Sequence, residues 1–205
     1  MKLQISFELT NLSDALNLAK KTYKFADVLE VGTLLLYKEG IKAIEVFKKE
    51  FPNKEILADA KICDHTKTAV ELFASAGADI ITVLAGTNNE EIQIAVKTAH
   101  SLNKKIALDL FGSYSTGQSA LDAEYAGVDS LVFIRKEQTP YVAADWGATR
   151  ANTKLPITVT GSINKDNITQ ILQMHPQAIS IGRAVTTSLE PDKIISEFYD
   201  MVKGL

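Results

Sequence analysis

The sequence predicts a (β/α)8 TIM barrel, an α/β fold formed by residues 1–205 as one domain. Short apolar strands alternate with helical stretches along the whole chain, in eight units of roughly 25 residues each. Polar residues fall at or just after the ends of several strands, as they do at the active face of such a barrel. A doubly wound open sheet also alternates strands with helices. The count of eight units and the position of the polar residues favour the barrel.

The first half of the chain contains four strand–helix units. Their strands are expected at Leu3–Glu8, Val28–Val31, Ile56–Lys61 and Asp79–Leu84. Their helices are expected at Ala15–Lys24, Gly40–Phe51, Thr66–Ala76 and Asn89–Leu102, where apolar residues recur at helical spacing. Ser13 is placed to cap the first helix, Pro52 ends the second, and Gly77 lies just past the third.

The second half repeats this alternation. Strands are expected at Ile106–Leu110, Leu131–Ile134, Ile157–Thr160 and Ala178–Ile181. Helices are expected at Thr116–Ala126, near Asp166–Met174, and from Pro191 to about Val202. The least regular stretch is Gln138–Arg150, which we interpret as a loop with a short helix.

Composition excludes several classes of function. The net charge of −3 and the pI near 5.7 provide no basic stripe for nucleic acid. The only cysteine, Cys63, has no partner for an internal disulfide, which fits a reducing compartment. The opening residues MKLQISFELT lack the apolar region of a signal peptide, and no apolar run approaches the length of a bilayer span. We therefore expect a soluble cytoplasmic protein with no nucleic-acid or membrane partner.

The stretch Leu57–Asp64, LADAKICD, carries the densest group of charges in the chain. Because side chains alternate along a strand, Asp59 and Lys61 share one face, and Asp64 lies just beyond in a loop. Two carboxylates around one ammonium form either a structural network or a site that holds an anionic intermediate. A surface pair contributes under about 1 kcal/mol and does not require so apolar a strand. The catalytic interpretation is therefore favoured.

Acidic residues at other strand ends converge on the same barrel mouth. They are Glu8, Glu30 and Asp109, in addition to Asp59. Such crowded carboxylates repel one another unless a cation lies among them, and a set without thiols or histidines suits Mg²⁺. Lys61 adds a fixed positive charge, so that the site could hold an enediolate. The alternative is a set of ion pairs inside the barrel.

A phosphate site is indicated by two loops. Thr160-Gly161-Ser162 follows the seventh strand, and Gly182-Arg183 follows the eighth. Glycine lets the backbone approach an anion closely, and the helix that follows presents free N–H groups. Loops after the seventh and eighth strands commonly bind phosphate in this fold, and Arg183 can add a bidentate contact.

Other candidate residues carry weaker signals. His65, next to Asp64, is either a solvated loop residue or a proton-transfer group. Trp146 is a candidate lid or helix anchor. Cys63 is interpreted as a small core residue, because no base is placed to activate it. His100 and His175 are expected at the surface.

The Asp-x-Lys-x-x-Asp pattern of Asp59, Lys61 and Asp64 resembles the orotidine monophosphate decarboxylase suprafamily. Glu30 within EVGT narrows the resemblance, because the UMP-forming decarboxylase would carry a lysine near that strand end. The chain is instead similar to the branch of 3-hexulose-6-phosphate synthase and 3-keto-L-gulonate-6-phosphate decarboxylase. The similarity covers nearly the whole chain, through MKLQ, EVGT, LADAKICD, AGADIITVL, NKKIALDLFG, TVTGS and ISIGRAV.

The resemblance implies a Mg²⁺-dependent barrel that forms an enediolate of a pentulose phosphate. Glu30 and Asp59 would bind the metal, Lys61 would stabilise the enediolate, and Asp109 would hold substrate hydroxyls. The phosphate would be held by Gly161, Ser162, Gly182 and Arg183. A homodimer is also implied, in which Asp64 reaches into the neighbour's site.

Two positions depart from the family pattern. The family ends its first strand with aspartate, where this chain has Glu8, and a side chain longer by one methylene moves the carboxylate by on the order of 1 Å. The family also places a proton-donating histidine at the end of the sixth strand, where this chain has Ile134, which cannot transfer a proton.

Three functional hypotheses follow from these residues. Asp109 in LDLFG favours synthase-type aldol chemistry between ribulose 5-phosphate and formaldehyde. Asp145-Trp146-Gly147 favours the alternative, decarboxylation of 3-keto-L-gulonate 6-phosphate. Glu8 and Ile134 motivate a third hypothesis from another class, a catalytically silent protein that binds sugar phosphates.

Overall fold

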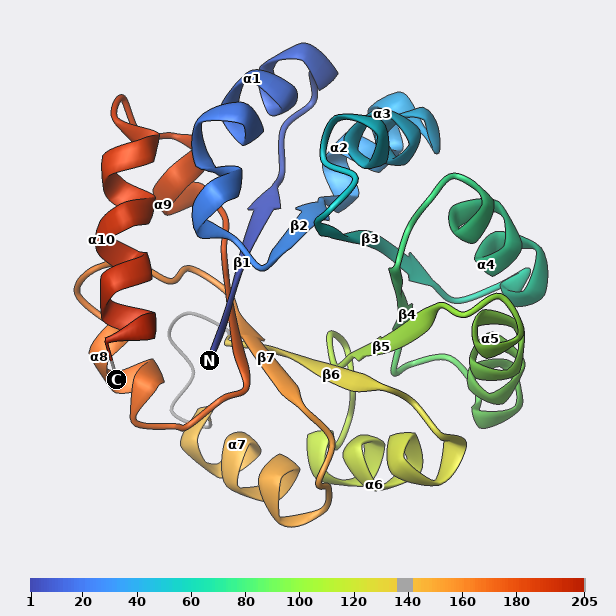
Figure 1. Ribbon diagram of the computed structural model, residues 1–205. Helices are drawn as coiled ribbons and strands as arrows, with labels where there is room; N and C mark the ends of the chain where they lie inside the picture. Colours follow the sequence, from blue (N-terminus) through green and yellow to red (C-terminus); the bar gives the residue numbers. More distant parts are fainter. Residues whose placement is uncertain (136–141, 205) are drawn as a thin grey trace.

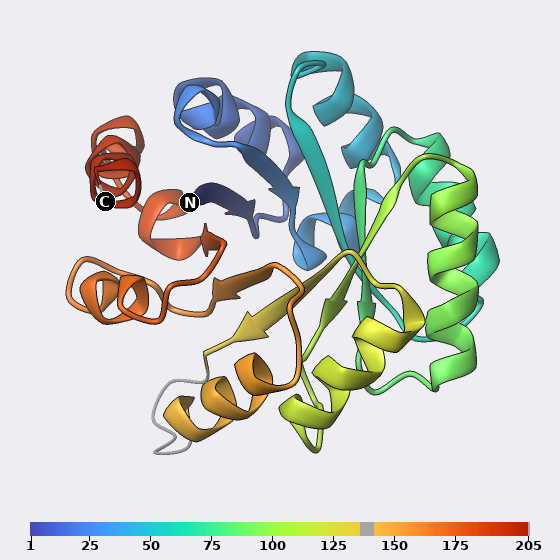
Figure 2. The same ribbon diagram turned by 60° about the horizontal axis from the view of Figure 1, so that its bottom comes forward.

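The computed structural model describes residues 1–135 and 142–204, and its eight parallel strands close into a barrel in sequence order (Figure 1). Each strand pairs with its neighbours in sequence, and β8 closes the barrel on β1. The helices form an outer ring around the strands (Figure 2). The predicted TIM barrel is therefore confirmed.

The strands are β1 (Lys2–Phe7), β2 (Val28–Val31), β3 (Glu55–Ile62), β4 (Ile80–Leu84), β5 (Lys105–Asp109), β6 (Ser130–Ile134), β7 (Ile157–Thr160) and β8 (Ala178–Ile181). The described helices are α1 (Leu12–Thr22), the 3₁₀ helix η1 (Tyr23–Phe25), α2 (Thr33–Glu39), α3 (Lys42–Glu50), α4 (Thr66–Ser75), α5 (Asn89–Ser101), α6 (Thr116–Ala126), α7 (Val142–Ala151), α8 (Ile168–Leu172), α9 (Arg183–Thr186) and α10 (Pro191–Lys203). None of the helices within these described residues is long and apolar enough to cross a membrane.

Strand β1 shows how alternation builds the two sides of the barrel wall. Ile5 and Phe7 are fully buried, and the Phe7 ring lies 5.3 Å from the ring of Phe47 on α3. Gln4 and Ser6, which alternate with them along the strand, face the barrel interior, where they line a cavity. One strand thus supplies both the apolar contact with the helices and polar groups for a site.

Four strands, β1, β3, β5 and β7, are fixed at their N-terminal ends by hydrogen bonds to side chains. In each, a backbone N–H near the start of the strand donates to a side chain that lies immediately before the next strand, and the four N–H···O distances are 2.8–3.0 Å. The acceptor–donor pairs are Asp27–Leu3, Asp79–Ile56, Asp129–Ile106 and Gln177–Ile157. This repeated contact stabilises the end of the barrel opposite the cavity.

Several local expectations were wrong. Asn11, not Ser13, caps α1, because its side chain accepts the Asp14 N–H at 3.0 Å. Helix α2 was not predicted, since its seven residues lie directly between a strand and the expected second helix. The stretch expected as a loop with a short helix contains the ten-residue α7, and its residues 138–141 lie outside the described part. Cys63 is exposed rather than in the core, because β3 ends one residue before it.

Candidate active site

A cavity of about 330 Å³ opens at the C-terminal ends of the barrel strands. Nearly all the residues predicted from the sequence to take part in catalysis or binding line this cavity. They are Glu8, Glu30, Asp59, Lys61, Asp109, Thr160, Gly161, Ser162, Gly182 and Arg183. Asp64 and His65 are not among the lining residues, and their side chains are 79% and 88% exposed.

The Lys61 ammonium lies between two carboxylates, that of Asp59 on β3 and that of Asp109 on β5. Its Nζ donates to both oxygens of Asp59 at 2.7 Å and to Oδ2 of Asp109 at 2.9 Å. Burial lowers the pKa of Lys61, but the charges of Asp109 and Asp59 outweigh it and raise the pKa above its ordinary value. Lys61 therefore remains a cation throughout the neutral pH range, as a group that stabilises an anion requires.

Asp109 is fully buried at the end of β5. Burial raises the pKa of its carboxyl, while the charge of Lys61 opposes that rise. Its Oδ1 accepts the Phe111 N–H at 2.9 Å, which fixes the carboxylate where the strand ends. The predicted network of two carboxylates around one ammonium is thus present, with Asp109 as the second carboxylate in place of Asp64.

Two threonines that sequence reasoning missed hold the Asp59 carboxylate. Thr33, at the start of α2, donates to Asp59 Oδ2 at 2.7 Å. Thr82, on β4, donates to Asp59 Oδ1 at 3.1 Å. The signal for Thr82 was available, because a threonine in the isoleucine-rich strand β4 interrupts its apolar run. Thr33 ends the EVGT stretch that narrowed the resemblance, but its contact with Asp59 depends on the unpredicted helix α2.

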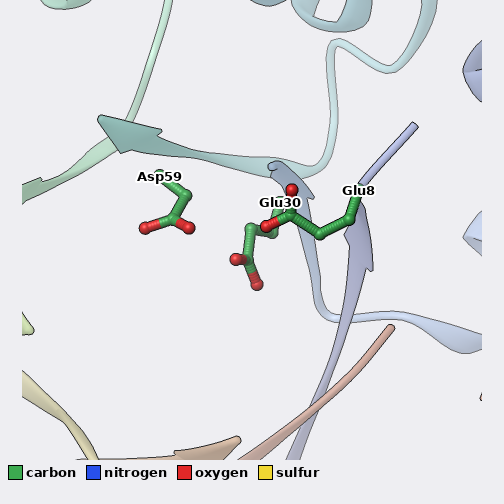
Figure 3. Close-up of side chains that lie close together, drawn as sticks. All are labelled: Glu8, Glu30 and Asp59. Carbon is green, nitrogen blue, oxygen red and sulfur yellow. The ribbon is translucent and has the colours of Figure 1, made fainter. Parts of the chain in front are cut away.

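The carboxylates of Glu8, Glu30 and Asp59 form a compact acidic group (Figure 3). One oxygen from each lies within 4.8 Å of the others. Glu30 Oε2 accepts from Gln4 at 2.5 Å and from Ser180 at 2.8 Å. Burial, with a smaller contribution from the Asp59 charge, raises the Glu30 pKa from 4.5 to about 7.

Glu8 reaches the N-terminus of α2. Its carboxylate accepts the Thr33 N–H at 3.3 Å and the Leu34 N–H at 3.0 Å. A Cβ atom on Gly32 would lie 2.5 Å from the Glu8 carboxyl carbon, so the close approach requires glycine at that position or a displaced Glu8 side chain. Glu8, where the resemblance implies an aspartate, therefore also fixes the first turn of α2.

The acidic group fits a hard divalent cation. All three donors are carboxylates, which Mg²⁺ prefers, and burial together with the charge of Asp59 keeps Glu30 partly protonated near neutral pH. Glu30 Oε1 receives no hydrogen bond from the described residues and is available as a ligand atom. A bound cation would relieve the mutual repulsion of the group.

The raised Glu30 pKa predicts a pH-dependent stability of the metal-free protein. Between pH 4.5 and about 7, folding takes up a proton at Glu30, so stability falls as pH rises and the full penalty is present above pH 7. We expect Glu30→Gln to become more stable than the wild type as pH rises from 5 to 8, by on the order of 2–3 kcal/mol. Urea unfolding in chelator would measure this difference. Exposed Glu90→Gln is the control, and parallel curves for Glu30→Gln and wild type would contradict the prediction.

The two predicted phosphate loops lie side by side at the cavity. Gly161 has φ +99°, and a Cβ there would lie 2.5 Å from the Arg135 carbonyl oxygen, so this position requires glycine. The Arg183 guanidinium donates to Ser162 Oγ at 2.6 Å, which joins the loops. Helix α9 begins at Arg183, directly after the loop that follows β8, whereas α8 begins only at Ile168, several residues after the loop that follows β7. The free N–H groups of a helix N-terminus, which were expected after both strands, are therefore present only after β8.

Ile134 lines the cavity at the end of β6, where the family resemblance implies a histidine. Val132, two residues earlier, lines the same wall, so this side of the cavity is apolar apart from Arg135. Trp146 packs edge-on against Phe133 with ring centroids 5.3 Å apart, which supports its role as a helix anchor. His100 bonds to Asp129 at 3.0 Å and is half-exposed, as a surface residue should be.

Comparison with known proteins gives one consistent result. Residues 1–198 match the model of the Orotidine 5'-phosphate decarboxylase / HUMPS family. The 3-hexulose-6-phosphate synthase of Bacillus subtilis (strain 168) is 29% identical over an alignment of 211 positions. The alignment covers 98% of this chain and 99% of that protein. The crystal structure of 3-hexulose-6-phosphate synthase from Salmonella typhimurium has a TM-score of 0.92 at 28% identity, covering 100% of this chain and 99% of that one. The structure of 3-keto-L-gulonate-6-phosphate decarboxylase from Vibrio cholerae has a TM-score of 0.88 at 24% identity, covering 99% and 97% of the two chains, a likeness of fold alone.

Proposed function

The chain belongs to the Orotidine 5'-phosphate decarboxylase / HUMPS family, and we propose that it is a Mg²⁺-dependent carbon–carbon lyase that acts on a ketose phosphate through an enediolate. The observation that carries this proposal is the Lys61 ammonium, held between Asp59 and Asp109 in a cavity that also contains the glycine loop and Arg183. The cavity thus places a fixed cation for an anionic intermediate and an anion cradle within reach of one small substrate.

The proposed roles follow from the position of each residue. The backbone of Gly161 and Ser162, with the Arg183 guanidinium, binds the phosphate and orients the sugar toward β3. Lys61 stabilises the negative charge that develops on the enediolate oxygens, without a change in its own protonation. The proton that leaves C1 passes to a carboxylate of the acidic group and exchanges there with solvent. Asp109 holds substrate hydroxyls at the buried end. Mg²⁺ held by Glu30 and Asp59, with Glu8 beside them, would polarise the substrate carbonyl as a Lewis acid.

Aldol chemistry of the 3-hexulose-6-phosphate synthase type is the activity we favour. The full-length similarity to synthases from Bacillus subtilis and Salmonella typhimurium supports it, as does the aspartate at position 109. Consumption of ribulose 5-phosphate that depends on formaldehyde would select the synthase. Release of CO₂ from 3-keto-L-gulonate 6-phosphate, without formaldehyde-dependent consumption, would select the decarboxylase instead.

A second candidate function is binding of sugar phosphates without turnover. Ile134 favours it, because an apolar side chain lines the cavity where the resemblance implies the proton donor. His65 does not fill this gap within one subunit, since its imidazole is 88% exposed and lies outside the lining residues. Tight binding of ribulose 5-phosphate, with neither formaldehyde-dependent consumption nor CO₂ release, would select this function.

We further propose a homodimer in which Asp64 serves the neighbouring site. Its carboxylate is 79% exposed and lies outside the cavity of its own subunit, which supports this role. If each site takes Lys61 from one subunit and Asp64 from the other, mixing inactive Lys61→Ala and Asp64→Ala variants restores one competent site per hybrid dimer. We expect recovery of up to about a quarter of wild-type activity, as statistical mixing gives for a C2 dimer. No recovery in exchanged dimers would contradict the shared site.

A further inference from the structure

Strand β3 leaves the regular ladder where its functional residues lie. Ala58 pairs with Ile81 and Ile62 pairs with Val83, so β3 advances by four residues while β4 advances by two. Residues 59–61 therefore lie opposite a single residue of β4, Thr82. Lys61 has φ +46°, a left-handed conformation that is unfavourable for lysine and that its surroundings must maintain.

The Thr82 hydroxyl supplies the contacts that this bulge needs. Thr82 is 1% exposed, and its Oγ1 accepts the Lys61 backbone N–H at 2.8 Å. The same hydroxyl donates to Asp59 Oδ1 at 3.1 Å. A hydroxyl has one proton to donate and lone pairs to accept with, so the two contacts are compatible. One side chain therefore fixes both the lysine backbone and the carboxylate that receives the lysine ammonium.

We propose that Thr82 is a positioning residue, which holds the β3 bulge so that the Lys61 ammonium lies between Asp59 and Asp109. This inference rests on the proposed function for its catalytic consequence, but its structural part stands independently. Thr82 lines the cavity with its hydroxyl committed to Asp59 and to the Lys61 amide, so it acts on the substrate through these residues. Loss of the hydroxyl would leave the partly buried Lys61 amide without its acceptor and Asp59 without one donor.

The test compares Thr82→Val, which keeps the shape and removes the hydroxyl, with Thr82→Ser, which keeps the hydroxyl. Thr87→Val is the matched control, because buried Thr87 donates to the carbonyl of Ile62 in the same strand at 3.4 Å. Amide hydrogen exchange of Lys61, followed by NMR, measures the bulge without any substrate. Steady-state turnover of ribulose 5-phosphate with formaldehyde measures the catalytic consequence, and thermal denaturation confirms that each variant is folded.

In Thr82→Val we expect the Lys61 amide to exchange at least about tenfold faster, and kcat to fall by about a hundredfold with a much smaller change in KM. Thr82→Ser should restore both quantities to within a few-fold, and Thr87→Val should change neither. Wild-type protection of the Lys61 amide in Thr82→Val would overturn the proposal, as would wild-type kcat in that variant. If the wild type itself shows no formaldehyde-dependent turnover, the favoured synthase activity fails, while the amide comparison still decides whether Thr82 holds the bulge.

Discussion

Replacement of Lys61 with alanine is expected to abolish turnover and to destabilise the protein at neutral pH. Without the ammonium, nothing in the described cavity offers a cation between Asp59 and Asp109, so a developing enediolate would meet two carboxylates. We expect kcat to fall by at least about a thousandfold. Breaking a buried ion pair also leaves fully buried Asp109 uncompensated, which costs about 3–5 kcal/mol.

Two further variants separate the two effects of Lys61. The double variant Lys61→Met with Asp109→Asn removes the charges of Lys61 and Asp109 but leaves Asp59, which keeps its hydrogen bonds from Thr33 and Thr82. It should therefore recover part of the lost stability and none of the activity. Lys104→Ala is a control at the opposite end of the barrel, where Asp79 keeps its second partner, Lys48. It should cost under about 1 kcal/mol and leave turnover unchanged. Unchanged kcat in Lys61→Ala would contradict the role assigned to Lys61.

Removal of divalent cations is the second change with a large expected effect. We expect chelation to reduce turnover by at least about a hundredfold and added Mg²⁺ to restore it, because the acidic group is most stable with a cation among its carboxylates. Mg²⁺ should also raise the melting temperature, since it binds only the folded arrangement. Calorimetry and thermal denaturation with and without Mg²⁺ would measure these effects.

Asp59→Asn should lose the Mg²⁺ response, because it removes one carboxylate of the group. Glu55→Gln is the matched control, since Glu55 lies on the same strand at the opposite end and pairs there with Lys2 and Lys105. It should retain the full response to Mg²⁺. A wild-type melting temperature that Mg²⁺ leaves unchanged at millimolar concentration would contradict the proposed metal site.

The barrel was predictable because its signal is repeated in the sequence. All eight strands were placed to within one residue at each end. Short apolar runs that alternate with helical stretches eight times along a chain are typical of this fold. Helix α2 was missed because it fills a short connection without an apolar period of its own. Cys63 was misplaced because its exposure depends on where β3 ends, and strand ends are set by tertiary pairing rather than by local pattern.

The residues of the candidate site were easier to predict than their partners. Charges at strand ends identified Lys61, Asp59 and Asp109 as a group, because the barrel brings strand ends together. Alternation also predicted that Asp59 and Lys61 share a face. Their side chains are in contact, but the strand bulges between them and the Lys61 backbone has a left-handed conformation. The roles of Thr82 and Thr33 depend on the register between strands and on an unpredicted helix, which no spacing in the sequence encodes.

Solvent proton exchange at C1 of ribulose 5-phosphate tests the central claim most directly. Wild-type protein with Mg²⁺ in deuterated water is predicted to incorporate deuterium at C1 without formaldehyde, because the enediolate forms before any second substrate is needed. Incorporation should disappear in Lys61→Ala and after chelation. Saturable binding of ribulose 5-phosphate by the wild type, with no deuterium at C1, would contradict enediolate formation at this site.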